Sequence, residues 1–256
     1  MGDTPYSEGE VRRLDALIDD LNTQQPAFVA HVGDITSGRG PCTDEWFEAR
    51  KQQFARLRIP FVLLPGDNDW TDCHRTGFDP MERLAKWRTL FCYSDQLPFN
   101  IERQDGEYCE HVRWQFQGLL FVALNVQGSN DNLGRTNAMD AEHAARSKAV
   151  LAWIADSEKL YNEKKLKGLV VLIQANPFLK PGRGANGYDA ILEQLTRLGA
   201  TYPGKVILVN GDTHIHRDDQ PLPGVRRIES YGSPLVGWLR VSIEAEKLRV
   251  EAGGLY

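Results

Sequence analysis

The sequence lacks the features that would place the protein in a membrane or on nucleic acid. No apolar run is long enough to cross a bilayer, and no basic segment followed by an apolar one opens the chain as a secretory leader would. The formal net charge is -5, so there is no basic excess of the kind that binds nucleic acid or an anionic membrane surface. We therefore expect a soluble chain with neither kind of partner.

The cysteines lack the paired C-x-x-C spacing of a zinc site. The four are Cys42, Cys73, Cys92 and Cys109. Cys42 and Cys73 each follow a Gly-Asp turn, so loops over one site could join them in a disulfide. Four free, partly buried thiols are an equally good interpretation. The sequence leaves the compartment open.

No internal repeat, low-complexity tract or linker divides the 256 residues, and 41% hydrophobic residues suffice for one large core. We expect a single domain over residues 1–256 in which helical and strand patterns alternate, as in an α/β fold. Helices are expected at 7–21, 44–57, 79–91, 137–161 and 188–198. Strands are expected at 28–32, 61–64, 112–116, 119–126, 169–173, 206–210, 227–231, 236–243 and 248–251.

Three acidic motifs stand where apolar runs end in turns. Residues 28–34 read FVAHVGD, residues 61–69 read FVLLPGDND, and residues 206–216 read VILVNGDTHIH. An apolar run that ends in Gly-Asp predicts a buried strand delivering a carboxylate to the carboxyl edge of a sheet, where open α/β sheets bind ligands. Three such motifs in one chain predict one metal-binding rim.

In this order the motifs resemble the signature of the calcineurin-like metallophosphoesterases, which runs D-x-H, G-D, G-N-H-[DE], a lone His and G-H-x-H. The resemblance spans nearly the whole chain and implies a metallo-dependent phosphatase-like fold, a four-layer α/β/β/α sandwich with two mixed β-sheets. In that family a strand precedes the first Asp. We therefore expect an additional strand upstream of residue 1, together with an exported or periplasmic location if a signal peptide was removed. Without that strand, Asp3 would be poorly anchored.

The resemblance also implies metal ligands, residue by residue. Asp3 stands at the Asp of D-x-H, with Pro5 in place of its His. Asp34 stands at the Asp that bridges both metals. Asp67 takes the place of the Asn of G-N-H-[DE], and Asn68 takes the place of the His that donates a proton or stabilises the transition state.

The last two motifs match less closely. Ala175 stands where the lone His is expected, which leaves a carbonyl oxygen of Gln174 or Asn176 as a substitute. Asp212 and His214 align with G-H-x-H without a gap, and a shift by two residues gives instead His214 and the second His of the motif, His216. We adopt the gapless alignment because it keeps the glycine in the turn.

The implied ligand set is rich in carboxylates and poor in imidazoles; it comprises Asp3, Asp34, Asp67, Asp212 and His214. Hard oxygen ligands favour Mg²⁺, Mn²⁺ or Ca²⁺ over zinc. We therefore expect one or two divalent ions per chain, Mn²⁺ or Mg²⁺ before others. Without a cation these carboxylates would repel one another and their pKa values would rise.

Other residues are candidates for catalysis and for contact with a substrate. His74 and Arg75 follow the second acidic turn, and Arg183 lies in a later Gly/Pro loop. Arg is suited to bidentate phosphate contacts, and His74 is a candidate for the proton donor missing at Asn68. The catalytic set is thus Asn68, His74 and Asp34, and the substrate set is Asn68, Arg75 and Arg183.

The leading hypothesis is a divalent-metal-dependent phosphoesterase that hydrolyses a small phosphate monoester or diester through a metal-activated water. The second is a degenerate member that binds metal or a phosphorylated ligand without turnover, for which Pro5, Asn68 and Ala175 argue. The third is a calcium-stabilised exported structural domain. The substrate and the oligomeric state are left open.

Overall fold

Strands and helices alternate along the chain as predicted. The computed structural model describes residues 1–93, 100–179, 184–244 and 247–255. In chain order the elements are α1 (Glu8–Gln24), β1 (Val29–His31), α2 (Asp44–Phe54), β2 (Phe61–Leu63), the 3-10 helix η1 (Thr71–Thr76), α3 (Pro80–Phe91), β3 (Glu102–Arg103), β4 (Val112–Phe116), β5 (Leu119–Ala123), α4 (Gly128–Asp131), α5 (Asn137–Glu163), β6 (Gly168–Leu172), α6 (Asp189–Thr201), β7 (Val206–Asn210), β8 (Arg217–Leu222), β9 (Val225–Glu229), β10 (Gly237–Glu244) and β11 (Lys247–Leu255). No helix within these ranges has the length and apolar character needed to cross a membrane.

The largest sheet in the described residues has seven strands, in the order β3-β4-β5-β6-β7-β9-β8. Strands β5, β6, β7 and β9 run parallel, and the outer strands pair antiparallel. Parallel strands that are covered on both faces are apolar throughout, because successive side chains point to opposite faces. In β6, Leu169 and Val171 enter one core, whereas Val170 and Leu172 enter the other.

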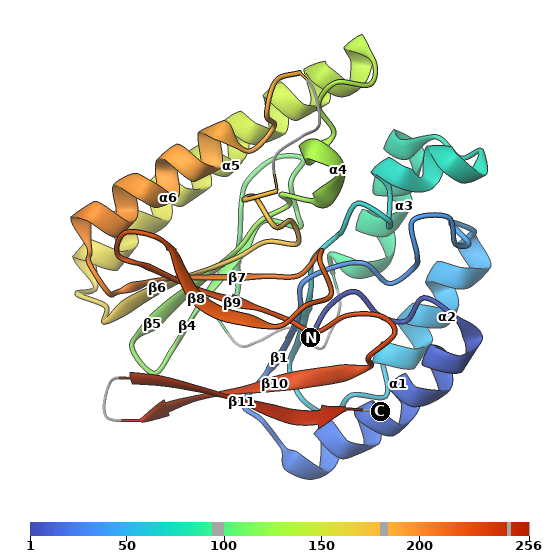
Figure 1. Ribbon diagram of the computed structural model, residues 1–256, viewed down its shortest axis with the longest axis horizontal. Helices are drawn as coiled ribbons and strands as arrows, with labels where there is room; N and C mark the ends of the chain where they lie inside the picture. The colour runs from blue at the N-terminus through green and yellow to red at the C-terminus, as the bar shows by residue number, and fades with distance from the viewer. Residues whose placement is uncertain (94–99, 180–183, 245–246, 256) are drawn as a thin grey trace.

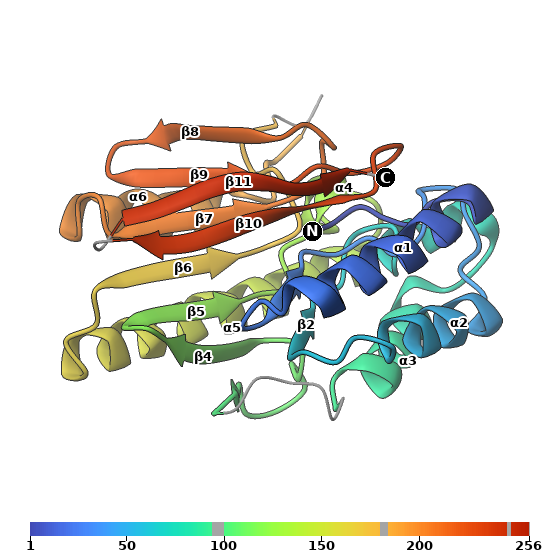
Figure 2. The ribbon, with the colours of Figure 1, turned by 90° about the horizontal axis from the view of Figure 1, so that it is seen from below.

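The large sheet lies between two layers of different kind. Helices α5 and α6 cover one face (Figure 1). The other face packs against the strand pairs β1–β2 and β10–β11. Helices α1 and α2 cover the far side of β1 and β2, and Figure 2 shows them on the side away from α6. This order of layers is compatible with the expected α/β/β/α sandwich.

The second sheet differs from the expectation of one mixed sheet. It is present as a parallel pair, β1–β2, and an antiparallel pair, β10–β11, and the described residues contain no strand that joins the two pairs. A cavity of about 390 Å³ lies between the pairs and the large sheet, and its lining includes Phe28, Val170 and Leu239.

The first three residues extend the edge of β1. The amino group of Met1 donates a hydrogen bond to Ala30 O at 3.1 Å, and Val32 N donates to Met1 O at 2.9 Å. Asp3 N donates to Gly33 O at 2.8 Å, and Asp3 is fully buried. The expectation that Asp3 would be poorly anchored is therefore wrong, because backbone hydrogen bonds attach it to the turn after β1. The additional upstream strand stays a prediction.

Local sequence signals account for most element starts. The Ser7 side chain caps α1 by accepting from Glu10 N, and the Asp79 side chain caps α3, whose first residue is Pro80. Strand β8 was not predicted, since its sequence RDDQPL has no apolar alternation. It can lack one because it is an edge strand of the large sheet with much of its length exposed.

All four cysteines form disulfides, Cys42–Cys73 and Cys92–Cys109. The free-thiol interpretation is therefore wrong. The loops after β1 and β2 carry Cys42 and Cys73, and these loops meet because the two strands are parallel neighbours. Both sulfur atoms lie near the carbonyl oxygen of Asn68, at 3.6 and 3.4 Å, so this disulfide braces the loop that carries Asn68.

Candidate metal centre

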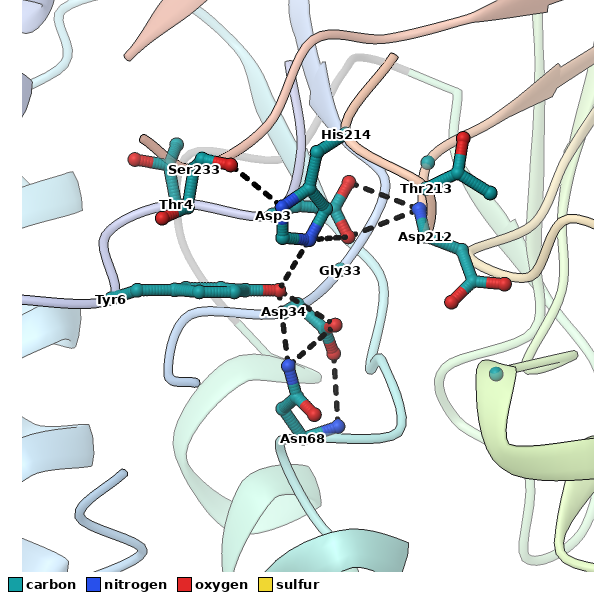
Figure 3. A network of polar contacts seen from close by, with 12 residues as sticks. Asp3, Thr4, Tyr6, Gly33, Asp34, Asn68, Asp212, Thr213, His214 and Ser233 are labelled. Atoms are coloured by element: carbon teal, nitrogen blue, oxygen red, sulfur yellow. Dashed lines mark hydrogen bonds and ion pairs between the residues drawn. The ribbon is translucent and has the colours of Figure 1, made fainter. Parts of the chain in front are cut away.

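The acidic motifs meet because the strands that precede them are parallel. Asp34 and Asp67 follow β1 and β2, while Gln174 and Asp212 follow β6 and β7. The carboxyl ends of parallel strands lie at one edge of a sheet, where α/β proteins bind ligands. Figure 3 shows Asp34, Asp212 and His214 gathered with Asp3.

Several of these residues hold backbone conformations that side chains disfavour. The φ angle is +52° at Asp3, +63° at Asp34, +80° at Asp212 and +63° at His214. For residues other than glycine the left-handed region costs about 1–2 kcal/mol each. Such conformations persist where the surrounding structure imposes them, and they concentrate at functional sites.

The glycines of the Gly-Asp motifs permit the close approach of one motif to another. A Cβ atom at Gly66 would overlap with Asp34 Oδ1, and one at Gly211 would overlap with Asp3 Oδ2. Gly66 and Gly211 therefore make room for the carboxylate of a different motif.

Asp34 lies at the centre of the site. Its Oδ1 accepts a hydrogen bond from Asn68 N at 3.0 Å. Its Oδ2 accepts from Tyr6 Oη at 3.0 Å, from Asn68 Nδ2 at 2.9 Å and from Gln174 Nε2 at 3.1 Å. These donors partly compensate the charge of a carboxylate that is 2% exposed.

One side of the site, which we call the Tyr6 pole, consists of Asp3, Asp34, His214 and Tyr6. His214 Nδ1 lies 2.7 Å from the carbonyl oxygen of Ser233, which can only accept. Nδ1 therefore carries the proton, and in the neutral ring Nε2 keeps its lone pair. Nε2 lies 3.3 Å from Tyr6 Oη and 3.9 Å from Asp3 Oδ1. The imidazole thus presents a ligand atom to the pole.

The other side, the carboxylate pole, contains Asp67 and Asp212. A Cβ atom at Gly128 would lie 2.8 Å from an oxygen of each, so the two carboxylates face each other across this glycine. Ser129 Oγ lies 2.8 Å from both Asp67 Oδ2 and Asp72 Oδ2. Asp72 in turn brings a third negative charge close to the pair.

Burial raises the pKa of every candidate carboxylate. Burial and the charge of Asp212 raise the pKa of Asp3 well above its usual value, and burial and the charge of Asp67 do the same for the pKa of Asp34. Burial, followed by the charges of Asp212 and Asp72, raises the pKa of Asp67 to about 8. Burial also raises the pKa of Asp212. In their ionised form these groups require a counter-charge.

The donor set fits a hard divalent cation in its chemistry, because it consists of carboxylates with one imidazole. The ligand atoms of this set lie farther apart than the ligand atoms around one bound cation. Among the described residues, the one group of three His, Cys, Asp or Glu donors within 4.8 Å of one another is Cys92, Cys109 and Glu110, whose cysteines form a disulfide. A cation at the rim would therefore draw the carboxylates closer together.

The residues after β6 occupy other roles than the resemblance suggested. Ala175 is fully buried in the apolar core beneath α5 and α6, so it takes no part in the rim. Gln174 does reach the site, although as a donor. Its Oε1 accepts from Gly128 N at 2.6 Å, which turns its Nε2 toward Asp34. Asn176 N donates to Asp212 Oδ2 at 2.9 Å, while the Asn176 side chain contacts Glu229.

The two histidines of the last motif contact different parts of the structure. His214 belongs to the Tyr6 pole, whereas His216 Nδ1 bonds to Glu229 O at 2.7 Å and its ring contacts Tyr231. The gapless alignment, with Asp212 and His214 as ligands, stays a prediction.

Of the expected substrate residues, Arg75 lies beside the carboxylate pole. Arg75 Nη1 lies 2.7 Å from Asp72 Oδ2, and Arg135 Nη2 lies 2.6 Å from Asp72 Oδ1. His74 is exposed, and its Nδ1 lies 2.8 Å from Thr71 O within η1. Arg183 lies outside the described residues. Arg75 thus reaches the rim through Asp72, whereas His74 Nδ1 contacts Thr71 O of its own turn and Arg135 Nη1 at 3.2 Å.

Sequence reasoning missed Tyr6, Ser129 and Arg135. One signal was available for Ser129, because a polar run follows the buried strand β5 just as the acidic motifs follow theirs. Residues 129–132 have φ between +51° and +69°, a left-handed turn that repeats the strain of the Gly-Asp motifs. Tyr6 carries no such signal.

Comparisons with known proteins bear on the family and the fold. The model of the calcineurin-like phosphoesterase family matches residues 1–216. A dimetal phosphatase from Danio rerio has a similar fold, with a TM-score of 0.58 and 12% identity over 91% of this chain and 86% of that one. The TT1561 protein of Thermus thermophilus has the same TM-score and identity, over 98% of this chain and 96% of that one. A search of curated proteins found no match. The chain belongs to the calcineurin-like phosphoesterase family.

Proposed function

We propose that the protein hydrolyses a small phosphate monoester or diester with the help of Mn²⁺ or Mg²⁺. The observation that carries this proposal is the rim of buried carboxylates, with His214 beside it, at the carboxyl edge of the parallel strands in a chain of this family. Burying several carboxylates together is costly unless a cation neutralises them.

Each residue of the rim has a role in the proposal. Asp3, Asp34 and His214 would hold one cation, and Asp34, Asp67 and Asp212 would hold a second. A divalent cation in such a site supplies Lewis acidity toward phosphate oxygens and makes water more acidic. Asn68 presents an amide N–H beside Asp34. It can stabilise negative charge on a phosphate oxygen, but it cannot act as a general acid.

The test is hydrolysis of an aryl phosphate monoester and of an aryl phosphate diester in the presence of Mn²⁺, Mg²⁺, Ca²⁺ or Zn²⁺. Turnover that depends on Mn²⁺ or Mg²⁺ is expected. Comparing the two substrates assigns the ester class, and comparing the cations separates the enzyme from a domain that Ca²⁺ merely stabilises. Failure of every combination would exclude the enzyme hypothesis for these substrates.

A second candidate function is favoured by one observation. Asp34 accepts hydrogen bonds from Tyr6, Asn68 and Gln174, so donors already occupy part of the space around this carboxylate. A protein that binds a cation or a phosphorylated ligand without turnover would tolerate this arrangement. Cation binding without hydrolysis in the assay above would select this candidate.

Replacement of Arg75 by Ala is expected to raise KM about tenfold with a smaller change in kcat, which corresponds to about 1.4 kcal/mol of lost binding. Arg75 is 38% exposed and reaches the carboxylate pole through Asp72, so its guanidinium can contact a bound phosphate. Steady-state kinetics would measure the effect. The matched control is Arg56→Ala, since Arg56 pairs with Asp15 and Asp19 away from the rim. Equal KM values for the two variants would contradict the role of Arg75.

Replacement of His74 is expected to lower kcat about 100-fold if its imidazole transfers the proton to the leaving group. His74→Asn removes the titrating ring while an amide N–H can still bond to Thr71 O. Full activity of His74→Asn would show that the residue serves only to hold its turn. The pH profile of kcat/KM gives a second reading, since the variant should lose one limb of the profile.

A further inference from the structure

The phenol oxygen of Tyr6 lies among the candidate ligands of the Tyr6 pole, although no motif includes this residue. Tyr6 Oη is 3.0 Å from Asp34 Oδ2 and 3.3 Å from His214 Nε2 (Figure 3). Asn68 Nδ2 donates to the same oxygen at 3.0 Å. The hydroxyl therefore lies between a carboxylate and an imidazole, at the pole where the family resemblance implies a histidine and this chain has Pro5.

The two separations around Tyr6 Oη are hydrogen-bond distances that also match neighbouring ligands of one ion, whereas the donors of Asp3, Asp34 and His214 are not all within 4.8 Å of one another. In octahedral coordination with metal–ligand distances near 2.1 Å, adjacent ligand atoms are about 3.0 Å apart. The separations from Tyr6 Oη to Asp34 Oδ2 and to His214 Nε2, 3.0 and 3.3 Å, are close to this value. The next separation, from His214 Nε2 to Asp3 Oδ1, is 3.9 Å. Tyr6 Oη thus lies between Asp34 Oδ2 and His214 Nε2.

The local structure holds the phenol in this position. Tyr6 N donates to Glu10 Oε2 at 2.8 Å, which ties residue 6 to the first turn of α1. The Tyr6 ring contacts the His214 ring edge to face, with centroids 5.2 Å apart. A side chain fixed by its backbone and by a ring contact loses little further freedom on binding an ion.

We propose that the phenol oxygen of Tyr6 is a ligand of the cation at the Tyr6 pole, together with Asp3, Asp34 and His214. Tyr6 thereby supplies the fourth protein ligand that Pro5 cannot provide. The inference rests on the proposed metal centre. It adds a ligand from the segment that precedes α1, outside the acidic motifs.

The test measures binding of Mn²⁺ alone, by calorimetry, to the wild-type protein, to Tyr6→Phe and to Tyr202→Phe. Tyr202 is the matched control because its hydroxyl bonds to Asn162 and Glu158, far from the rim. We expect Tyr6→Phe to weaken one Mn²⁺ site at least about tenfold, while Tyr202→Phe binds as the wild type does.

A second measurement starts from the wild-type protein and so does not depend on the folding of a variant. Mg²⁺ is added to the wild-type protein and the ultraviolet difference spectrum is recorded. In the proposal Tyr6 binds the ion as phenolate, so its proton passes to solvent and a phenolate band appears. The band should persist in Tyr202→Phe and be lost in Tyr6→Phe.

The outcomes separate the two proposals. Wild-type affinity in folded Tyr6→Phe would overturn the ligand role of Tyr6 and leave the metal centre intact. Weaker binding without any phenolate band in the wild type would also overturn it, because Tyr6 would then only position Asp34. Absence of Mn²⁺ binding by the wild-type protein would overturn the proposed metal centre itself.

Discussion

Replacement of Asp34 by Asn is expected to reduce metal-dependent phosphate ester hydrolysis by at least about 1,000-fold, equivalent to about 4 kcal/mol of transition-state stabilisation. In the proposal Asp34 is a ligand of both cations, and both Tyr6 Oη and Gln174 Nε2 donate to its Oδ2. The amide keeps the size of the side chain and removes its charge. Both candidate cation sites would therefore lose a ligand at once.

The measurement is kcat/KM for the better aryl phosphate ester in saturating Mn²⁺. The control is Asp156→Asn, which removes a carboxylate that is 55% exposed and paired with Lys159. Asp156→Asn should retain wild-type activity. Substantial activity in a folded Asp34→Asn variant would exclude the rim as the place of catalysis and trace the hydrolysis to another site or to a contaminant.

Removal of divalent cations at pH 8 is expected to lower the melting temperature by about 5–10 °C. Binding at a cation concentration 100 times the Kd contributes about 2.7 kcal/mol to the free energy of unfolding. For a chain of this size each kcal/mol shifts the melting temperature by about 2–4 °C. The buried carboxylates of the rim are the groups that lose their counter-charge.

The effect should depend on pH in a defined direction. Burial and the charges of Asp212 and Asp72 raise the pKa of Asp67 from 3.8 to about 8, and burial raises the pKa of Asp69 to about 7. A carboxyl with a raised pKa binds more protons in the folded state than in the unfolded state. The metal-free protein therefore loses stability as the pH rises from about 4 to about 8.

Cations compete with these protons, so their stabilising effect should grow across the same range. Thermal melts with Mn²⁺ and with a chelator, taken from pH 5 to pH 8, would measure the difference. A difference in melting temperature that is the same at both ends of the range would mean that the cation binds elsewhere. Asp67→Asn should flatten the pH dependence of the metal-free protein.

The local signals in the sequence were sufficient for most of the fold. Ser7 and Asp79 predicted the starts of α1 and α3, because capping depends on residues close in sequence. The apolar runs of β6 and β7 predicted buried strands, because that pattern also depends on residues close in sequence. The polar edge strand β8 could not be predicted, because its sequence has no apolar alternation. Its backbone hydrogen bonds to β9 do not require one.

Only the residues of the acidic motifs could be assigned to the candidate site from the sequence. Asp34 and Asp67 follow apolar strands, and that arrangement signals a sheet edge. Tyr6 and Gln174 reach the same edge from segments without such a signal, and their contacts with Asp34 span 28 and 140 residues of sequence. Contacts of that separation depend on the packing of whole elements.

The sequence by itself determined the α/β order, the carboxylate-rich rim and the family, because each depends on the identity of residues within a short stretch of chain. The tertiary structure decided which side chains face one another. It paired Cys42 with Cys73, buried Ala175 in the core and brought Gln174 to the rim in its place. It also brought the hydroxyl of Tyr6 between Asp34 and His214. These neighbours are set by the parallel packing of strands far apart in the chain, and short-range patterns do not record that packing.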